Sequence, residues 1–359
     1  MKILFVSLRG ATNKERKGGA QEYIHKVAFE LQLLGHDTIV YCGPEKLNGA
    51  ALPEHEIVEG VEVKRFDSLK ALRQAIAQNY QNYNFVIENV MSFALFTPSI
   101  VKNVPLIAIR HHLQKKNFFK LQGLVKGAVG FISEQLIEPY KYKNITWVAA
   151  SELTASDLNK RLIKPRKPIH VINPGFTHIE KNIPQSETPL LFYVGALNTA
   201  RKKIDHVIDV FKEVREIIPD VELVVAGEGP DFVGLKDKAK DLPVTFLGFI
   251  TEEEKHEWYQ RSWLFVSPSV SEGFGITWIE ANAHGVPVIC YDLGLDTLNN
   301  ECALLIPKND LIALKEGIIM LLKDTRIRER MKVGALKNAG RYNWGNTAKK
   351  IEELMLKMI

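Results

Sequence analysis

The chain alternates short apolar runs with segments of helical periodicity, and this alternation occupies both halves of the sequence. In the first half the apolar runs cover residues 3–7, 38–42, 61–66, 85–87, 106–109 and 146–150. In the second half they cover residues 190–194, 221–226, 245–247, 264–266, 288–291 and 303–306. Apolar strands separated by helices are typical of a parallel sheet with helices on both faces. The pattern therefore predicts an α/β fold with two similar, doubly wound, Rossmann-like domains.

Turn-forming residues mark the boundary between the two domains. Asn173-Pro174-Gly175 and the polar segment 180–189 lie between the two sets of runs. A chain of 359 residues is also more typical of two domains than of one. We expect a first domain over residues 1–178 and a second over residues 179–342. Ligands of open parallel sheets bind beyond the carboxyl ends of the strands, so two sheets facing each other predict a central cleft.

Charge and cysteine content narrow the functional class. The net charge of +5 and the pI near 8.8 suit an anionic ligand or a membrane surface, but lack the clustering expected of a nucleic-acid binder. Cys42, Cys290 and Cys302 are too widely spaced to indicate a disulfide framework or a zinc site. Residues 3–6 are too short for a signal-peptide core, and no uncharged apolar run reaches membrane-spanning length. We expect a cytoplasmic protein.

The segment from 271 to 280 is the strongest candidate for a ligand site. Gly273 and Gly275 fall where a strand gives way to a helix, so the backbone can approach a ligand and the first helical amides can hold a phosphate. Glu272 and Glu280 bracket this turn, and two turns of helix separate them by roughly 11 Å. At this separation one carboxylate can accept hydrogen bonds from the hydroxyls of a sugar, and the other can accept them from the hydroxyls of a ribose. Solvated acids on a capped helix are the alternative interpretation.

From Ser271 to Ile289 the sequence resembles the signature of the retaining family 4 glycosyltransferases, the glycosyl transferases of group 1. That signature places Glu, Gly-Phe-Gly, a second Glu after seven residues, then Ala and a Gly-x-Pro-Val strand in this order. Nearly every element is present here. Further matches along the chain are Gly18-Gly19-Ala20, Ala150-Ser151-Glu152, Val171-Ile172-Asn173-Pro174-Gly175 and Ala226-Gly227-Glu228-Gly229-Pro230.

The resemblance implies the GT-B fold, with an acceptor-binding first domain, a nucleotide-sugar-binding second domain and a C-terminal helix, residues 343–359, that crosses back to the first. It implies a hexosyl- or N-acetylhexosaminyltransferase that moves a sugar, with retention, from a nucleotide diphosphate sugar to a hydroxyl of a glycan or lipid-linked acceptor. Such enzymes serve cell-envelope glycan biosynthesis. The donor-binding residues implied are Glu272, Gly273, Phe274, Gly275, Ile276, Thr277 and Glu280. Because the chain contains no Asp-x-Asp, we expect no metal and no cofactor besides the donor.

Three consecutive basic residues follow the first strand of the second domain. Arg201, Lys202 and Lys203 are suited to neutralise a diphosphate leaving group as charge develops on it. The resemblance matches the family's catalytic lysine to Lys202, with Arg201 beside it. Ala196 stands where the family commonly has an arginine, so a bidentate phosphate donor is lost unless Arg201 or Lys203 replaces it. A solvated basic loop is the alternative.

His111-His112 follows the apolar run 106–109, so at least one imidazole is expected at the edge of the sheet. The resemblance places the family's active-site histidine on His111, with His112 as the alternative. It implies that this ring binds the donor sugar and stabilises charge near the reacting carbon. A purely structural histidine fits the same pattern.

Gly18 and Gly19 end a polar loop, residues 12–17, that follows the first strand. Such a loop can close over phosphates and sugar, and its glycines admit close backbone contact, although flexible glycine turns are common. The G-x-G-x-x-G fingerprint is absent from this turn, which argues against a nicotinamide enzyme.

Lysines interleave with an apolar stripe between residues 115 and 132. The lysines are Lys115, Lys116, Lys120 and Lys126, and the stripe is Phe118, Leu121, Val125, Ala128 and Ile132. This pattern is typical of a basic interfacial helix. The candidates for contact with the acceptor or with the inner face of a membrane are Lys115, Lys116, Phe118, Phe119 and Lys120. An ordinary helix packed on the sheet has the same pattern.

Two other classes of function fit part of the sequence. A sugar-nucleotide epimerase or a phosphorylase shares the two-domain fold, although the Glu-x7-Glu segment is more typical of the transferases. A non-catalytic nucleotide-binding scaffold is suggested by Ala196 and by Leu293-Gly294-Leu295-Asp296, where the family more often has paired glycines and a glutamate. Catalysis is favoured because both glutamates, the glycines, Lys202 and a histidine occur together.

Overall fold

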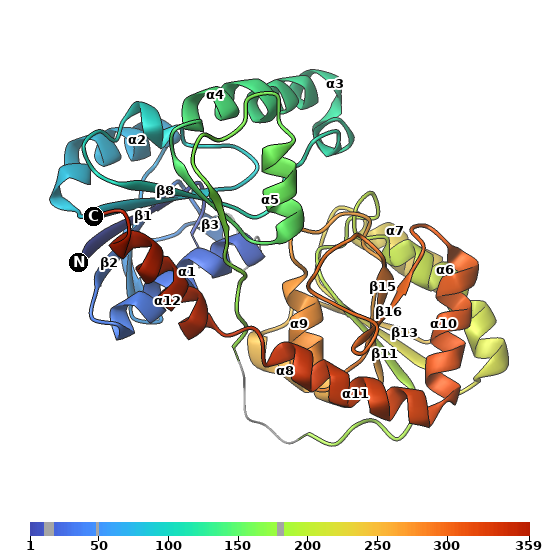
Figure 1. Cartoon of the computed structure of the whole chain (residues 1–359). Helices are drawn as coiled ribbons and strands as arrows, with labels where there is room; N and C mark the ends of the chain where they lie inside the picture. The colour runs from blue at the N-terminus through green and yellow to red at the C-terminus, as the bar shows by residue number, and fades with distance from the viewer. Residues whose placement is uncertain (11–17, 48–49, 178–182) are drawn as a thin grey trace. The chain divides into compact units, whose positions relative to one another are not determined.

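The computed structural model describes residues 1–10, 18–47, 50–177 and 183–359, and the chain divides into two compact units. Unit 1 consists of Met1–Gly175 and Asn343–Ile359, and unit 2 consists of Phe176–Tyr342. Each unit has its own sheet with helices around it (Figure 1). The division after Gly175 lies a few residues before the expected boundary at 178.

The sheet of unit 1 has the strand order β10-β9-β8-β7-β1-β2-β6-β5. Neighbouring strands are parallel except for β5, which runs antiparallel to β6 at the edge. A separate two-stranded pair joins β3 and β4. The strands are β1 Lys2–Ser7, β2 Asp37–Cys42, β3 Lys46–Leu47, β4 Ala50–Ala51, β5 His55–Val58, β6 Val61–Arg65, β7 Phe85–Val90, β8 Leu106–Arg110, β9 Thr146–Ala149 and β10 Ile169–Val171.

Helices cover both faces of this sheet. Residues of α1 and α12 pack on Ile3 and Phe5 of β1, whereas α2 packs on Leu4 and Val6, which point to the opposite face. The helices are α1 Gly19–Leu33, α2 Leu69–Asn79, α3 Asn117–Ile132, α4 Glu138–Tyr142, α5 Glu152–Asn159 and α12 Trp344–Leu356. Short helical turns cover Tyr80–Asn82, Thr97–Ser99 and, with π geometry, Ser133–Ile137.

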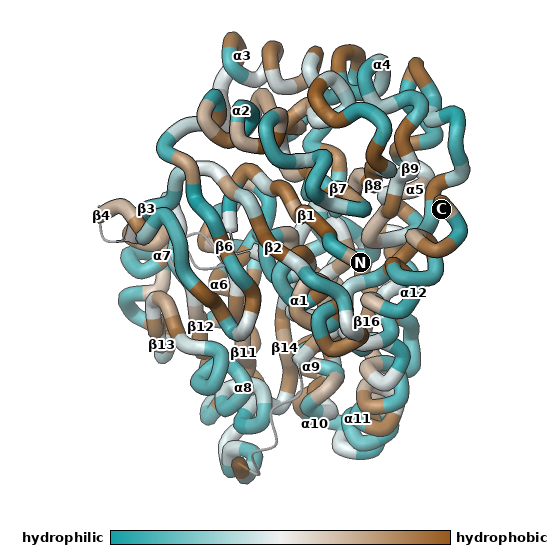
Figure 2. The backbone as a smooth tube through the Cα atoms, turned by 90° about the vertical axis from the view of Figure 1, so that its left-hand side faces the viewer, coloured by the Kyte–Doolittle hydropathy of each residue, from teal (hydrophilic) through white to brown (hydrophobic). Residues whose placement is uncertain are grey.

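The sheet of unit 2 is parallel throughout, in the order β13-β12-β11-β14-β15-β16. Its strands are β11 Leu190–Val194, β12 Glu222–Ala226, β13 Val244–Gly248, β14 Leu264–Ser267, β15 Val288–Tyr291 and β16 Ala303–Ile306. Its helices are α6 Ile204–Ile217, α7 Phe232–Lys238, α8 Glu252–Arg261, α9 Ile276–Ala283, α10 Leu311–Lys323 and α11 Thr325–Ala339. The strands β1 and β14, each central to its sheet, are strongly hydrophobic (Figure 2).

Helix starts differ in a way that bears on ligand binding. Ser68, Ser151, Asp310, Asp324 and Asn343 each accept a hydrogen bond from a backbone amide in the first turn of their helix. The helices α1, α6 and α9, which follow β1, β11 and β14, have no such side-chain cap. The helices α3, α4 and α7 lack one as well. The first amides of α1, α6 and α9 are therefore left without a side-chain partner at the centre of each sheet.

The C-terminal helix α12 completes the core of unit 1 (Figure 1). The indole of Trp344 contacts the ring of Tyr23 edge-on at 5.8 Å, and Thr347 Oγ1 donates to the carbonyl of Asn173 at 2.8 Å. A Cβ on Gly175 would lie 2.2 Å from the backbone nitrogen of Trp344, so only glycine allows this approach. The helix begins at Trp344, within the expected segment 343–359, and the side chain of Asn343 caps it.

The strands β3, β4, β5 and β10 were not expected from the sequence. The first two contain two residues each, and β10 contains three. The remaining strand, β5, lies at the edge of the sheet, begins with two polar residues and has no buried residue, so it lacks the apolar run by which buried parallel strands are found. The antiparallel edge makes the sheet of unit 1 mixed rather than purely parallel.

Candidate functional site

The carboxyl ends of β11 and β14 define the candidate site in unit 2. The strand order reverses between these neighbours, and ligands of such sheets bind beyond the strand ends at this point. The loop after β11 carries Arg201 and Lys202, and the loop after β14 carries Glu272 and Gly275. The topology thus brings together two motifs that are far apart in the sequence.

Lys202 and Glu272 form an ion pair in this site. Lys202 Nζ donates to Glu272 Oε1 at 2.5 Å, and the two side chains are 15% and 11% exposed. Burial by itself would raise the pKa of Glu272, but the charges of Lys202 and Arg201 outweigh it and lower the pKa to about 2. The Glu272 carboxylate is therefore ionised at neutral pH and sits next to a cation.

The turn at Gly275 connects this pair to a helix N-terminus. Gly275 has φ 89° and ψ 56°, and a Cβ there would lie 2.3 Å from the Trp278 ring, so both conformation and space require glycine. The amides of Ile276 and Thr277 lie in the first turn of α9, where a helix offers them no acceptor. Residue 275 is a glycine, so no side chain caps them either. Free amides at the positive end of a helix suit an anionic group such as a phosphate.

The side chain of Phe274, in the same turn, is buried in unit 2. Its side chain is 5% exposed and packs edge-on against Tyr342 with ring centroids 5.1 Å apart. Its carbonyl accepts a hydrogen bond from Thr297 Oγ1 at 2.7 Å. The side chain of Phe274 therefore fills a small core below the turn, and the expected donor contact of this residue stays a prediction for its backbone. Ile276 is partly buried against the same cluster.

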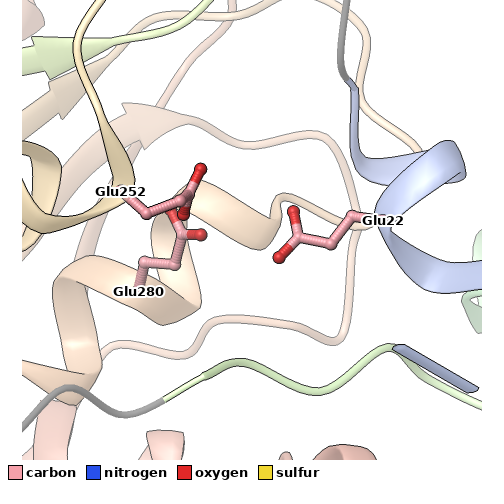
Figure 3. A group of neighbouring side chains, drawn as sticks. All are labelled: Glu22, Glu252 and Glu280. Carbon is pink, nitrogen blue, oxygen red and sulfur yellow. The ribbon is translucent and has the colours of Figure 1, made fainter. Parts of the chain in front are cut away.

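Glu280 is buried inside α9 and is held by two donors. Its Oε1 accepts from Lys255 Nζ at 2.7 Å, and its Oε2 accepts from the Tyr259 hydroxyl at 3.1 Å. Lys255 also pairs with Glu252 at 2.7 Å, so the two carboxylates lie close together (Figure 3). Glu22, drawn in the same figure, belongs to the first turn of α1 in unit 1. Each carboxylate oxygen has two lone pairs, so Glu280 retains capacity for a ligand hydroxyl.

The loop after β11 contains Ala196 at the position where the glycosyltransferases that this sequence resembles commonly have an arginine. Ala196 is exposed, and its methyl group offers no hydrogen-bond donor. The guanidinium of Arg201 is partly buried, makes no hydrogen bond to any residue that the structure describes, and contributes its charge to the environment of Glu272. The guanidinium of Arg201 therefore has hydrogen-bond donors that no described residue uses. Lys203 adopts φ 55° at the start of α6.

In unit 1 the strand order reverses between β1 and β7, and His111 follows the neighbouring strand β8. His111 Nε2 lies 2.8 Å from Asn89 Oδ1 at the end of β7. The Asn89 side-chain nitrogen donates to Ser7 Oγ at 3.0 Å and to the Ala20 carbonyl at 3.1 Å. This network makes Asn89 Oδ1 the acceptor, so His111 Nε2 carries the hydrogen and Nδ1 is the acceptor nitrogen.

The protonation state of His111 follows from its surroundings. Burial lowers its pKa to about 3, with smaller contributions from His112 and Arg110. The Tyr23 ring packs edge-on against the imidazole with centroids 5.2 Å apart. His111 is therefore a neutral imidazole at physiological pH. It can accept a hydrogen bond from a sugar hydroxyl at Nδ1, but it does not supply positive charge.

Gly18 and Gly19 lie at the start of α1, next to this network. Gly18 is the residue before the helix, in an extended conformation, and its carbonyl accepts from the amides of Gln21 and Glu22. Ala20, in the first turn, is bound by Asn89, which ties the helix start to the end of β7. The polar loop expected to close over a ligand, residues 12–17, lies outside the described part of the chain.

The basic segment before and within α3 is arranged differently from the expectation. Phe118 is 1% exposed and packs against Phe93, so its side chain is not on the surface where the expected acceptor or membrane contact would lie. Lys115 pairs with Asp157 at 2.7 Å, and Lys116 is exposed. Phe119 is partly buried against Phe131. The side chain of Lys120 lies outside what the structure describes.

The exposed apolar residues of this region form a face on α3 and the helical turns after it. They are Leu124, Val125, Val129, Ile132, Leu136, Ile137 and Tyr140. Leu124 and Val125 are each 81% exposed, and Lys126 beside them is exposed as well. No helix in the described part of the chain is long and apolar enough to cross a membrane.

Sequence reasoning missed three residues that organise these sites. Lys255 and Tyr259 are on α8 and bind Glu280, and Asn89 binds His111. Asn89 had a usable signal, because it is a polar residue near the end of a buried strand that lies beside β1. Lys255 and Tyr259 had none, because they become partners of Glu280 only through the packing of α8 against α9.

Two mainly parallel α/β units of this kind make up the GT-B fold, and comparison with solved structures shows this fold. HepE of Anabaena, solved in complex with UDP and glucose, superposes with a TM-score of 0.78 at 16% identity, covering 99% of this chain and 100% of that one. Residues 176–338, nearly the whole of unit 2, match the family model described as Glycosyl transferases group 1.

Curated relatives agree with this class. The poly(glycerol-phosphate) alpha-glucosyltransferase of Bacillus subtilis is 28% identical over 226 residues, which cover 61% of this chain and 31% of the relative. The phosphatidyl-myo-inositol mannosyltransferase of Mycolicibacterium smegmatis is 22% identical over 350 residues, which cover 91% of this chain and 87% of the relative. The chain spans about a third of the Bacillus relative and less than half of several others. The chain is therefore similar to glycosyltransferases in sequence, and its fold is GT-B.

Proposed function

We propose that this protein transfers a hexosyl or N-acetylhexosaminyl group from a nucleotide diphosphate sugar to a hydroxyl of a glycan or lipid-linked acceptor, with retention of the anomeric configuration. The observation that carries the proposal is the unit 2 site. There Glu272, the uncapped start of α9 and the buried Glu280 follow β14, and Lys202 reaches Glu272 from the loop after the neighbouring strand β11. The match of residues 176–338 to the group 1 family supports it.

Each part of this site suits one part of the donor. Glu280 accepts hydrogen bonds from the ribose hydroxyls, and the amides of Ile276 and Thr277 bind the diphosphate. Lys202 and Arg201 neutralise the charge that develops on the leaving phosphate. Glu272, ionised and fixed by Lys202, accepts hydrogen bonds from the sugar hydroxyls. In unit 1, neutral His111 accepts a sugar hydroxyl at Nδ1.

Retention without a covalent intermediate fits the state of Glu272. A double displacement needs a nucleophilic carboxylate at the anomeric carbon. The Glu272 carboxylate is held by Lys202 and has a pKa of about 2, and both features reduce its nucleophilicity. We therefore propose a front-face reaction, in which the leaving phosphate takes the proton of the acceptor hydroxyl as that hydroxyl attacks. Lys202 and Arg201 neutralise the charge on the leaving diphosphate, which a metal ion does in other transferases. The proposed reaction is therefore metal-independent.

The acceptor is proposed to be part of the cell envelope and to be reached at the inner face of the membrane. Relatives named for poly(glycerol-phosphate) and for phosphatidyl-myo-inositol support such an acceptor. The exposed apolar face around Leu124, Val125 and Val129, with Lys126 beside it, has the chemistry of a peripheral membrane contact.

The membrane contact is tested by co-sedimentation with vesicles of phosphatidylcholine, with and without phosphatidylglycerol. We expect binding that requires the anionic lipid and weakens in high salt. The variant Leu124→Ser/Val125→Ser should bind several-fold less, whereas Ile312→Ser, which changes an exposed apolar residue of unit 2, should bind like the wild type. Equal binding by all three proteins would contradict the contact.

The activity is tested by incubating the protein with UDP-, GDP- and ADP-sugars and a membrane extract, in the presence of EDTA. Release of nucleoside diphosphate that depends on the extract, with an α-configured product from an α-configured donor by NMR, is the expected result. Conversion of the donor alone into an epimer would favour the epimerase. Tight nucleotide binding without turnover would favour the scaffold, and loss of activity with EDTA that Mg²⁺ or Mn²⁺ restores would contradict metal independence.

A further inference from the structure

Glu280 is an unusual ligand group because so little of it is exposed and so much of it is already bound. The residue is 4% exposed, and both carboxylate oxygens have partners on α8. A buried carboxylate is costly unless a positive charge and hydrogen bonds compensate it. The residues that compensate Glu280 therefore decide whether it can act on a ligand at all.

Lys255 supplies the charge. Its Nζ lies 2.7 Å from Glu280 Oε1 and 2.7 Å from Glu252 Oε2, and its side chain is 10% exposed. Glu280 is 5% exposed in this pair, whereas Glu252 is 49% exposed. Screening by water weakens the interaction with Glu252 and leaves the one with Glu280 as the stronger. One ammonium thus forms a buried ion pair with Glu280.

Tyr259 fixes the second oxygen. Its hydroxyl lies 3.1 Å from Glu280 Oε2 and 3.1 Å from the Thr277 carbonyl, and it has one hydrogen for these two acceptors. When a ligand hydroxyl donates to Glu280 Oε2, the tyrosine hydrogen can turn to Thr277 without losing a hydrogen bond. The ring itself is held between Phe192 and His284, so the hydroxyl keeps its position.

We infer that Lys255, together with Tyr259, is a positioning residue that makes Glu280 a specific acceptor for the ribose hydroxyls of the donor nucleotide. Lys255 holds Glu280 Oε1 through an ion pair, and Tyr259 holds Oε2 through a hydrogen bond, so the orientation of the carboxylate is fixed. The pair thereby determines the discrimination between a ribonucleotide and a deoxyribonucleotide. The inference rests on the proposed function, because it assumes that the donor ribose reaches Glu280.

The test compares ribose and deoxyribose ligands by isothermal titration calorimetry. UDP, GDP and ADP are titrated beside their 2′-deoxy counterparts into the wild type, Lys255→Met, Lys255→Arg, Tyr259→Phe and the exposed-site control Lys240→Met. A hydrogen bond to a charged group makes the wild type prefer the ribonucleotide by about tenfold or more. We expect Lys255→Met to reduce this preference to below about threefold, and Tyr259→Phe to give an intermediate value.

A purely structural role for Lys255 predicts another pattern, in which both affinities fall and their ratio stays constant. Recovery of the preference in Lys255→Arg, and an unchanged preference in Lys240→Met, support the positioning role. A full preference retained by Lys255→Met, or no preference in a wild type that binds the nucleotide, overturns the inference alone. A wild type that binds none of the six ligands overturns the proposed function and the inference with it.

Discussion

Lys202 and Glu272 are 70 positions apart in the sequence, yet Lys202 Nζ lies 2.5 Å from Glu272 Oε1. The loops that carry them follow β11 and β14, which are neighbours where the strand order reverses. The pair thus joins the cation proposed for the leaving group to the carboxylate proposed for the sugar. Its geometry is set by the sheet rather than by local sequence.

The variant Lys202→Met tests this coupling. It leaves the Glu272 carboxylate without its cation at a site that is 11% exposed, so we expect the free energy of unfolding to fall by about 3 kcal/mol. Loss of the cation should lower kcat by about a hundredfold or more. The double variant Lys202→Met/Glu272→Gln removes both charges and should regain stability without regaining activity. Urea denaturation and donor turnover measure the two effects, and a double variant as unstable as the single one would contradict the pairing.

The same pair predicts a pH dependence of stability. The pKa of Glu272 is about 2 in the folded protein against an ordinary value of 4.5, so the unfolded chain binds the proton more readily. The stabilisation is complete above pH 4.5 and is lost as the pH falls toward 2, and it amounts to about 3 kcal/mol. Chemical denaturation of the wild type between pH 6 and pH 2.5 should show this loss. The double variant Lys202→Met/Glu272→Gln should show a shallower slope, and parallel slopes would rule out Glu272 as the source.

The sequence predicted the sheets far better than the side-chain networks. All twelve apolar runs correspond to strands of the two sheets, because buried parallel strands are continuously hydrophobic. Edge strand β5 escaped this criterion because its residues are half exposed. The motif from Glu272 to Glu280 was found as a turn and helix start, and the structure places it at one.

The buried partners could not be predicted in the same way. In the sequence Lys255 is one of several charged residues at the start of α8. Its contact with Glu280 depends on the packing of α8 against α9, which the sequence pattern does not show. Phe274 lies inside a motif associated with the donor, but its side chain is in the core. The stripe that contains Phe118 was read as one helical face, whereas Gly123, with φ 74°, interrupts the helix and separates buried Phe118 from exposed Val125.

His111 provides a second pH test with a different window. Its pKa is about 3 in the folded protein against an ordinary value of 6.5, because burial disfavours the charged ring. The contribution to stability is therefore full above pH 6.5 and decreases as the pH falls toward 3. The variant His111→Gln should lose this part of the slope, and the exposed-site variant His55→Gln should keep it. Donor turnover by His111→Gln should be lower by about tenfold or more, since an acceptor for a sugar hydroxyl is lost.

Variants at Arg201 and Ala196 test which side chain binds the phosphate of the donor. If Arg201 replaces the arginine that the sequence lacks at position 196, Arg201→Met should weaken binding of a nucleoside diphosphate by about tenfold. It should leave binding of the corresponding nucleoside nearly unchanged, because the nucleoside has no phosphate. Ala196→Arg should restore part of the lost affinity when combined with Arg201→Met. Calorimetric titration measures these affinities, and equal losses for nucleotide and nucleoside would contradict a phosphate contact.

The most direct test of the account is a thermal-shift measurement with UDP, GDP, ADP and their sugar conjugates on the wild type and on Glu280→Gln. A ligand that binds the folded state raises Tm, and the rise grows with the ratio of ligand concentration to Kd. We expect a clear rise in Tm of the wild type for the conjugates of one nucleotide, and a rise reduced to near zero in Glu280→Gln. No rise with any of these ligands, or an equal rise in both proteins, would contradict the placement of the donor in unit 2.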